Sequence, residues 1–562
     1  MARQFLAEDL LSNLDEEQRL AAESLVGPTC ILAGAGTGKT RTITHRIAYG
    51  IAKGYYAANR VLALTSTNRA AGELRSRLRA LGASGVQVKT FHAAALSQLE
   101  FFWPQFAGVP APQVLESKGK LIGLAANELG LKLDTAALRD VAAEIEWRKY
   151  SMLSIEQYAE LAVKRPKVGS LSAEQNVALQ EQYELSKVRS QKLDWEDVLI
   201  LTLGMLRAEP LALSHVQQQY RFFTVDEYQD ISPLQHELLD IWMGDHTDLC
   251  VVGDPNQTIY SFTGATSDFL RNFASRYEDA KVLQLTQNYR STQKIVSAAN
   301  RVVAETSSVD PLTFHGEVGD DVRVLQFANI ADEAREVALA VREQLNAGVK
   351  PNEIAVLYRV NGQSEIFEAA LADQQVEYQL RGGERFFNRP EIVRAMTALR
   401  AESNSAPRED KSTFELVTDV CRSLGWTARE PDAAGAERDR WESLSALIAM
   451  LGEMPEESTL AQFAAELDER KRSQHEPVKP TVTLSTIHAA KGLEWSNVFI
   501  VGVTEGYLPI AYANTVGEIA EEKRLFYVAI TRAKKKLSIS WSKRDNNSGR
   551  EREPSRFLSL VA

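Results

Sequence analysis

Short apolar runs that suggest buried strands alternate with helical segments along most of the chain. Strands that alternate with helices usually form parallel sheets covered by helices on both faces. The pattern runs through the first half of the chain and restarts near residue 281, so we predict the α/β class with two tandem parallel-sheet cores. The expected strands are 29–34, 60–65, 221–226 and 248–254, then 281–286, 321–327, 353–358, 481–486, 497–502 and 536–541.

Two segments interrupt this alternation. Residues 96–190 are helical in period and rich in Leu, Ala, Glu and Gln, and residues 395–480 are also helical in period. We expect each segment to be a mainly helical insertion into one core. The predicted domains are 1–95 with 191–282 for the first core, 96–190 for its insertion, 283–394 with 481–562 for the second core, and 395–480 for its reduced insertion.

Cysteine usage and hydropathy argue against several protein classes. The three cysteines of the 562-residue chain match no CxxC spacing, which disfavours a disulfide framework and a cysteine zinc site. No apolar run approaches the ~18 residues of a membrane span. The N-terminal MARQFLAEDLL has acids where a signal peptide needs an apolar stretch, so we expect a cytoplasmic protein without a membrane partner.

The net charge of −11 taken alone argues against binding to nucleic acid, but the charge is unevenly distributed. Residues 41–79 hold eight Lys or Arg and one acid, and residues 523–544 hold eight Lys or Arg and no acid. Residues 431–470 hold ten acids and three arginines. The two basic stripes could bind a nucleic acid locally, although a solvated helix face is the alternative reading of each.

The segment AGAGTGKT, residues 33–40, follows a predicted strand and opens a predicted helix, which is the context of a phosphate-binding loop. Its glycines let backbone N–H groups turn onto phosphates. Lys39 would supply a cation to the β- and γ-phosphates, and the Thr40 hydroxyl would ligate Mg²⁺. A strict pattern has Gly at Ala33, so a glycine-rich turn without a ligand is the alternative. The predicted ATP-binding residues here are Ala33, Gly34, Ala35, Gly36, Thr37, Gly38, Lys39 and Thr40.

Two carboxylates follow the strand at 221–226, within VDEYQD. Ligands bind at the carboxyl ends of strands in parallel sheets. Asp226 is therefore placed to hold Mg²⁺, and Glu227 to orient or deprotonate the attacking water. An acidic turn is the alternative for this motif alone.

With these motifs in order, the chain resembles the UvrD/Rep-like helicases of superfamily 1, from about residue 14 to about residue 559, and most closely actinobacterial members with a small second insertion. Two RecA-like cores, 1A and 2A, with insertions 1B and 2B, are what the resemblance implies. The segments that carry it include LDEEQRLAAES, LALTSTNRAAGEL, KTFHAA, LDWEDVL, VVGDPNQTIYSFTGA, QNYRST, YRVNGQS, LRGGERFFNRPEI, TIHAAKGLEW, EEKRLFYVAITRAKK and PSRFL.

The resemblance assigns roles to further residues. Gln18 would read adenine, Tyr289 would stack on it, and Glu494 would also bind ATP. Gln257, Arg290 and Arg532 would act at the γ-phosphate. Arg290 and Arg532 are both expected in the second core, which would tie hydrolysis to closure of the two cores. The resemblance implies contacts with DNA for Thr65, Asn68, Phe91, His92, Tyr260, Phe262, Arg359, Asn361, Thr486 and His488. Taken singly, each of the aromatic residues among them is more often a packing residue than a base platform.

The chain departs from the family at several DNA-facing positions. The family usually has an aromatic residue where Ser66 stands, and Trp then Arg where Phe262 and Thr263 stand. The insertion at 395–480 is short, is acidic over 431–470, and lacks the family's Gly-Ile-Gly duplex-contact segment. We therefore expect a weaker grip on single strands and little duplex binding by this insertion.

The sequence predicts an ATP- and Mg²⁺-dependent DNA helicase or translocase that moves 3′ to 5′ on single-stranded DNA and separates duplex strands in repair or replication. Single-stranded DNA and single-strand/duplex junctions are the expected partners, and a repair-protein partner is left open. One alternative is a translocase that displaces proteins with little unwinding. Another is an ATP-gated DNA-binding regulator of a repair assembly, which would hydrolyse ATP without moving along DNA.

Overall fold

The computed structural model describes residues 7–561, apart from 134, 166–167, 169–170, 382–386, 388, 405–410, 429–442, 446, 449, 453, 456, 474–479 and 545–550. The chain forms two compact units. The first comprises Met1–Arg290 with Val303–His315, and the second comprises Ser291–Val302 with Gly316–Ala562.

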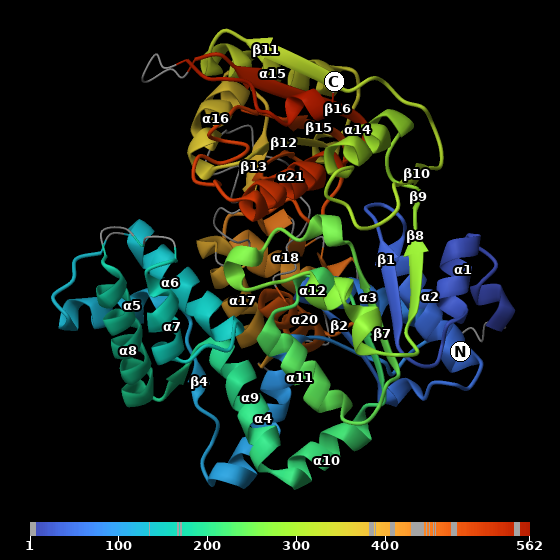
Figure 1. The fold of residues 1–562 in the computed structure, drawn as a ribbon, viewed down its shortest axis with the longest axis vertical. Coiled ribbons are helices and arrows are strands. Elements are labelled where there is room, and N and C mark those ends of the chain that lie inside the picture. Colours follow the sequence, from blue (N-terminus) through green and yellow to red (C-terminus); the bar gives the residue numbers. More distant parts are fainter. Residues whose placement is uncertain are drawn as a thin grey trace. The chain divides into compact units, whose positions relative to one another are not determined.

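The first unit is built on a six-stranded parallel sheet with the order β3-β2-β6-β7-β1-β8 (Figure 1). Its strands are β1 (Thr29–Ala33), β2 (Val61–Thr65), β3 (Gln87–Thr90), β6 (Phe222–Val225), β7 (Leu249–Gly253) and β8 (Lys281–Leu285). Its helices outside the insertion are α1 (Glu16–Glu23), α2 (Lys39–Ala52), α3 (Asn68–Ala80), α4 (Phe91–Ala107), α9 (Trp195–Ala208), α10 (Pro210–Gln219), α11 (Pro233–Met243), α12 (Asp268–Arg271) and α13 (Phe273–Arg276). A two-stranded pair, β9 (Gln287–Asn288) and β10 (Thr313–Phe314), follows β8.

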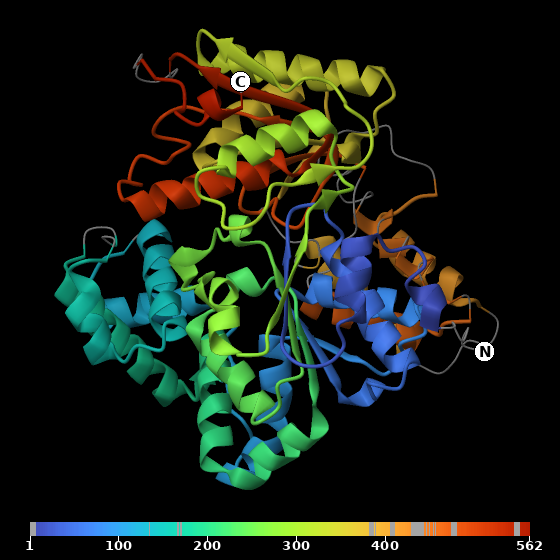
Figure 2. The same ribbon diagram turned by 45° about the vertical axis from the view of Figure 1, so that its right-hand side comes forward.

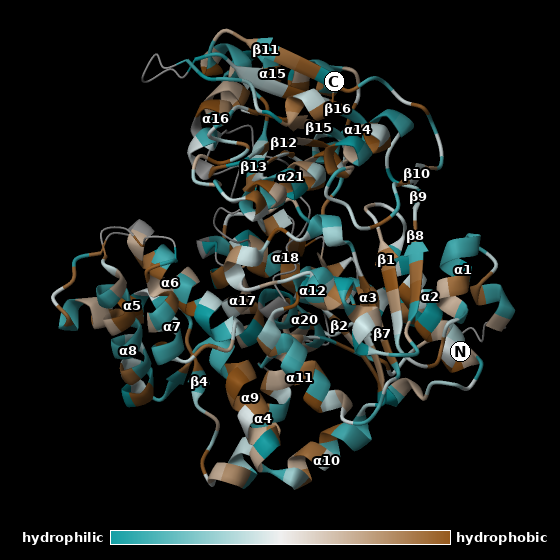
Figure 3. Ribbon diagram, in the orientation of Figure 1, coloured by the Kyte–Doolittle hydropathy of each residue, from teal (hydrophilic) through white to brown (hydrophobic). Residues whose placement is uncertain are grey.

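Apolar side chains on both faces of this sheet explain why its strands read as unbroken apolar runs. Successive residues of a strand point to opposite faces. Cys30 and Leu62 accordingly pack with α4, α9 and α11, whereas their neighbours Ile31 and Ala63 pack with α1, α2 and α3. In Figure 3 strand β1 is mainly brown, whereas helix α8 of the insertion is mainly teal. Two buried layers therefore enclose the sheet, as expected for a parallel α/β core.

The strand at 281–286 was expected to open the second sheet, and that expectation is wrong. It forms β8, which pairs with β1 in parallel at the edge of the first sheet. The predicted boundary between residues 282 and 283 falls inside this strand. Leu285 is buried with the first core, while Lys281 and Val282 are exposed as on an edge strand. An apolar run shows that a strand exists but not which sheet it joins.

The insertion of the first unit is helical, as predicted. It contains α5 (Lys118–Glu128), α6 (Thr135–Tyr150), α7 (Ile155–Ala162) and α8 (Ala173–Ser190), with a short parallel pair formed by β4 (Gln113–Val114) and β5 (Lys192–Leu193) (Figure 2). A small core of its own includes Ile122, Ile145 and Tyr183. Helix α4 crosses the predicted boundary at 95–96, because Leu99 and Phe102 bury against the first core.

The second unit contains a six-stranded parallel sheet with the order β11-β16-β15-β12-β14-β13. Its strands are β11 (Arg323–Phe327), β12 (Ile354–Tyr358), β13 (Tyr378–Arg381), β14 (Val482–Thr486), β15 (Trp495–Ile500) and β16 (Ala533–Ser542). Its helices include α14 (Gln293–Val303), α15 (Ile330–Asn346), α16 (Ser364–Asp373) and α21 (Val516–Ile530). The prediction missed β3 and β13, whose short and partly polar sequences carry a weak apolar signal.

The insertion of the second unit has an apolar core of its own. Among the described residues, α17 (Pro390–Ser403), α18 (Thr413–Ser423) and α20 (Leu460–Ser473) pack around Leu399, Cys421 and Phe463. Part of the acidic stretch at 431–470, and part of the LRGGERFFNRPEI segment at 380–392, lie outside the described residues.

Cys30, Cys250 and Cys421 are buried free thiols, and Cys30 and Cys250 lie in the apolar strands β1 and β7. No single helix among the residues that the structure describes is long and apolar enough to cross a membrane. The pair α9 and α10 meets the length and composition test only jointly, with a bend of 108°.

Candidate nucleotide and DNA sites

The predicted phosphate loop connects β1 to α2, and two of its side chains donate hydrogen bonds to its own backbone carbonyls. Gly36 and Gly38 have φ of +72° and +83°, a backbone conformation that favours glycine. The Thr37 hydroxyl donates to the Gly34 carbonyl at 2.9 Å. The Lys39 ammonium donates to the carbonyls of Ala33 and Gly34 at 3.2 and 3.4 Å. The loop thus has the conformation and the cation that phosphate binding requires.

The predicted adenine-reading residue, Gln18, lies against this loop. Its side-chain Nε2 donates to the Thr37 carbonyl at 2.9 Å, and the side chain is buried. Asp15 caps the N-terminus of α1 by accepting from the Gln18 N–H at 2.7 Å. The capping residue therefore fixes the start of the helix that carries Gln18.

The two predicted carboxylates stand at the end of β6, in the same unit as the loop. The Asp226 N–H donates to the Leu64 carbonyl at 2.8 Å, which holds the strand end in the sheet. Burial, followed by the neighbouring Glu227 carboxylate, raises the pKa of Asp226 to about 7, and Lys39 opposes this shift. Glu227 has a φ of +54°, a strained value for a residue with a side chain. Its carboxylate accepts from Gln229 Nε2.

Oxygen donors of this kind suit Mg²⁺, which is commonly held by one or two carboxylates together with phosphate and water oxygens. Crowding of Asp226 beside Glu227 leaves negative charge that a cation would neutralise. Among the described residues, no group of three or more His, Cys, Asp or Glu side chains could enclose a metal ion. Thr40 and Asp226, the two Mg²⁺ ligands predicted from the sequence, carry a hydroxyl and a carboxylate, which are oxygen donors of the kind that Mg²⁺ takes.

Gln257 lies in a short helical turn after β7. Its Nε2 donates to Asp254 Oδ2 at 2.8 Å, and its N–H donates to the Asp254 carbonyl at 2.9 Å. Gln229 links this turn to the carboxylate pair, because its Oε1 accepts from the Asp254 N–H at 3.0 Å. Motifs predicted separately from the sequence are thus joined by hydrogen bonds.

The segment after β8 lies on the phosphate loop. It belongs to the first unit as far as Arg290, so the expectation that Arg290 comes from the second core is wrong. The Tyr289 N–H donates to the Gly36 carbonyl at 2.9 Å, and Asn288 Nδ2 donates to the Ala35 carbonyl at 2.7 Å. The Tyr289 phenol donates to the Asp15 carboxylate, and its ring centroid is 5.0 Å from that of His315. Burial and this carboxylate raise the pKa of the Tyr289 phenol above its ordinary value.

Phe91 was expected to contact DNA, and the structure corrects that expectation. The residue is 6% exposed, belongs to the first core, and stacks on Trp242 with ring centroids 5.9 Å apart. A ring that is packed inside the core is not available to a base. Its neighbour His92 instead contacts the insertion, where Tyr150 Oη lies 3.2 Å from His92 Nε2.

Trp195 is an aromatic residue in this region that sequence reasoning missed. It is 45% exposed, and its ring meets that of His92 edge-on, with centroids 5.8 Å apart. Burial, with Lys118 nearby, lowers the pKa of His92 to about 4, so the ring is neutral near pH 7. In the segment LDWEDVL the tryptophan directly follows the helix-capping Asp194, which is the local signal from which this residue could be predicted.

Tyr260 and Phe262 lie next to the same insertion. Phe262 is 52% exposed, and its ring centroid is 6.1 Å from that of Tyr260. A Cβ on Gly264, at the end of this turn, would lie 3.0 Å from Tyr150 Cβ, so the turn packs closely on α6. Tyr150 thus contacts both His92 and the turn that carries the predicted base platforms.

Thr65 is buried at the end of β2, and Asn68 begins α3 and accepts from the Thr90 hydroxyl at 3.5 Å. Ser66, between them, is exposed.

Not every cation of the basic stripe at 41–79 is exposed to solvent. Arg46 is buried and donates to the carbonyls of Ser24 and Leu25.

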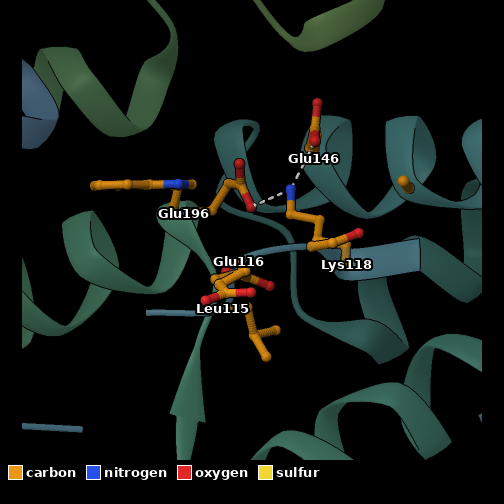
Figure 4. Close-up of a pocket in the computed structure, with 9 residues that line it drawn as sticks. Leu115, Glu116, Lys118, Glu146 and Glu196 are labelled. Carbon is orange, nitrogen blue, oxygen red and sulfur yellow. Dashed lines mark hydrogen bonds and ion pairs between the residues drawn. The ribbon is translucent and has the colours of Figure 1, made fainter. Parts of the chain in front are cut away.

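A cavity of about 280 Å³ opens beside Trp195, at the junction of the insertion with α9. Figure 4 shows Lys118 between Glu146 and Glu196. The Lys118 Nζ lies 2.6 Å from a carboxylate oxygen of each. Burial raises the pKa of Glu196 to about 7, although Lys118 opposes the shift. Because carboxylates outnumber the single lysine in the lining, the cavity does not suit a phosphate group.

The predicted residues of the second unit already have partners inside that unit. Arg359 forms an ion pair with Glu522 at 2.7 Å. Burial, then Arg359 and Lys491, lowers the pKa of His488 to about 3. Thr486 accepts from the Ala489 N–H through its hydroxyl. The side chain of Asn361 lies outside the described residues.

Two predicted nucleotide residues also lie in the second unit. Glu494 pairs with Lys534 at 2.7 Å. Arg532 is buried and donates from Nε to the Val528 carbonyl at 3.0 Å and from Nη1 to the Leu493 carbonyl at 3.1 Å. These contacts hold the guanidinium in a fixed place within its unit.

A phosphate loop after β1, carboxylates after β6 and a second parallel α/β unit define a tandem-core P-loop nucleotide hydrolase. Comparisons with known proteins narrow this class. The UvrD/REP helicase N-terminal domain matches residues 14–278, and the UvrD-like helicase C-terminal domain matches residues 283–431 and 425–544.

Similar proteins match nearly the whole chain. The ATP-dependent DNA helicase UvrD2 of Mycobacterium tuberculosis (strain ATCC 25618 / H37Rv) is 43% identical, over 99% of this chain and 82% of the relative. DNA helicase II of Haemophilus influenzae is 30% identical, over 98% and 87%. The ATP-dependent DNA helicase PcrA of Bacillus subtilis is 27% identical, over 99% and 87%.

The chain belongs to the UvrD/Rep family of helicases. It is a DNA-dependent ATPase and DNA helicase that uses ATP and binds DNA. The resemblance found in the sequence, the α/β fold class and the enzyme class are thereby confirmed.

Proposed function

We propose that this helicase walks 3′ to 5′ along single-stranded DNA, acts at junctions between single strands and duplex in repair or replication, and walks better than it unwinds. The direction rests on the resemblance to the family. The observation that carries the proposal is the pair of exposed aromatic faces, Trp195 and Phe262, in the unit that also holds the phosphate loop.

ATP hydrolysis is assigned to residues of both units. Thr40 and Asp226 would hold Mg²⁺, which supplies charge neutralisation at the phosphates when bound. Glu227 orients or deprotonates the attacking water. Gln257 and Arg290 act at the γ-phosphate, and Arg532 contributes to transition-state charge, a role worth ~10³–10⁵ in rate for arginine fingers of other nucleotide hydrolases.

The single strand would be gripped mainly by stacking. Each stacked base contributes roughly 1–3 kcal/mol, and the stacking tolerates any sequence. Trp195 and Phe262 offer exposed rings, and the neutral His92 ring supports Trp195 from its edge. A cationic histidine is not needed in this arrangement, because the phosphates would be met by the exposed members of the basic stripes.

The second insertion is the reason to expect modest unwinding. Opening duplex DNA costs about 1.4 kcal/mol per base-pair step, which ATP hydrolysis can supply. Efficient opening also needs a hold on the duplex ahead of the junction. The insertion in this chain is short and acidic, and lacks the Gly-Ile-Gly element expected of a duplex contact.

Two measurements on the unaltered chain test the proposal. Stopped-flow translocation should be measured on single strands labelled at the 5′ end. A lag that lengthens with strand length is expected, because the protein must walk to that end. Single-turnover unwinding of a 3′-tailed duplex should stop after fewer nucleotides than translocation does. Unwinding as processive as translocation would contradict the argument from the insertion. ATP turnover independent of strand length would favour the ATP-gated regulator instead.

A further inference from the structure

One buried amide connects the phosphate loop to the segment that carries Arg290. Asn288 is 1% exposed and lies in β9 of the first unit. Its Nδ2 donates to the Ala35 carbonyl at 2.7 Å, and its Oδ1 accepts from the Arg290 N–H at 2.9 Å. The amide therefore spans from a loop carbonyl to the backbone of the arginine.

The phosphate loop and the segment that carries Arg290 are in close van der Waals contact at Gly36. A Cβ built on Gly36 would lie 2.6 Å from Asn288 Nδ2 and 2.8 Å from Arg290 Cβ. The Gly36 carbonyl also accepts from the Tyr289 N–H at 2.9 Å. Two consecutive loop carbonyls thus bind two consecutive residues, so a shift of the loop must move the segment as well.

Other contacts hold the segment in place independently of Asn288. The Glu17 carboxylate accepts from the Thr286 N–H at 2.6 Å and from its hydroxyl at 2.8 Å. The Asp15 carboxylate accepts from the Tyr289 phenol. Removing the Asn288 amide should therefore leave the segment attached to α1 and disturb chiefly the setting of Arg290.

We propose that Asn288 is a positioning residue that transmits the state of the phosphate loop to Arg290. When phosphates enter the loop, the Ala35 carbonyl and the Arg290 backbone move as one through the amide. Hydrolysis then becomes competent only when the loop is filled. The inference rests on the proposed action of Arg290 at the γ-phosphate.

The test is a double-mutant cycle on the full chain, with ATP turnover measured at saturating single-stranded DNA. Asn288→Ala should lower kcat by at least about tenfold, because it displaces a group that acts on transition-state charge. Its affinity for ADP, which has no γ-phosphate, should stay within about threefold of the unaltered chain. In an Arg290→Ala background the same substitution should change kcat by less than about twofold. Gln287→Ala, whose amide contacts His315 rather than the loop, is the matched control and should leave kcat unchanged.

Several outcomes would overturn the proposal. A fall in ADP affinity as large as the fall in kcat would mean that Asn288 only supports the loop. Losses that multiply in the double variant would mean that it does not act through Arg290. Asn288→Asp keeps the acceptor for the Arg290 N–H but loses the donor to Ala35, and it serves if Asn288→Ala does not fold. Normal turnover in Asn288→Asp would remove the link to the loop. Normal turnover in Arg290→Ala would overturn the assignment of Arg290 to the γ-phosphate, and with it the proposed role of Asn288.

Discussion

Replacement of Trp195 by alanine should weaken binding to single-stranded DNA in a chain that still folds. The side chain is 45% exposed, so about half of its surface is free to meet a base. A stacked base contributes roughly 1–3 kcal/mol, which corresponds to an affinity about 5- to 150-fold lower in Trp195→Ala. The fold loses the edge-on contact with His92, about 0.5–1.5 kcal/mol, and the burial of the covered half of the side chain.

Phe91→Leu is the matched control, because Phe91 is the neighbouring aromatic residue that is packed in the core. It should lower stability by about 1 kcal/mol through loss of the stacked pair with Trp242, while the affinity for DNA is unchanged. Fluorescence anisotropy with a labelled oligothymidylate at fixed salt measures affinity, and denaturant unfolding measures stability. The reasoning fails if Trp195→Ala binds as tightly as the unaltered chain, or if Phe91→Leu weakens binding in a protein that remains fully folded.

Three further predictions follow from the site. Lys39→Ala and Glu227→Gln should each abolish DNA-stimulated ATP hydrolysis in a chain whose circular dichroism is unchanged; turnover near the original rate in either would refute the assignment. Arg532→Ala should lose hydrolysis by orders of magnitude yet keep its affinity for nucleotide, whereas collapsed affinity with normal saturated turnover would assign it to ground-state binding. DNA affinity should fall at least about tenfold between 50 and 200 mM salt, since the exposed parts of 41–79 and 523–544 would release counterions; a flat response would exclude them as the main contact.

The sequence predicted the two parallel cores because their central strands are buried on both faces and so read as apolar runs. The edge strand β8 is not buried on both faces, since Lys281 and Val282 are exposed. Its short apolar pattern therefore could not show that it pairs with β1 in the first sheet. The phosphate loop was predictable because strand, glycines, lysine and helix are contiguous. The hydrogen bonds from Gln18 and Asn288 to that loop join residues 19 and 253 positions apart and leave no local pattern.

The aromatic residues show why DNA contacts are harder to predict than the nucleotide site. Phe91 and Trp195 each begin a helix, and the two helices α4 and α9 pack together. Which ring ends inside the core and which remains outside depends on the packing of those helices, to which residue type gives no guide. Arg359 presents the same difficulty, because its partner Glu522 is 163 positions away.

The helical insertion of the first unit is attached to the start of α9 by buried charges. Lys149 lies 2.7 Å from Asp194 and 2.6 Å from Asp197, and Lys187 contacts the same two carboxylates. Burial opposes ionisation, but the two ammonium groups outweigh it and hold the pKa of Asp194 below its usual range.

Separating such a cluster would leave unpaired charges in a low-dielectric interior. Removing one partner of a buried ion pair typically costs about 3–5 kcal/mol. We therefore expect the insertion and Trp195 to travel as one mechanical element during each step along the strand. The conformational change that each step requires must then occur at places other than the contact between the insertion and α9. A crosslink between α8 and α9 should leave stepping speed unaltered.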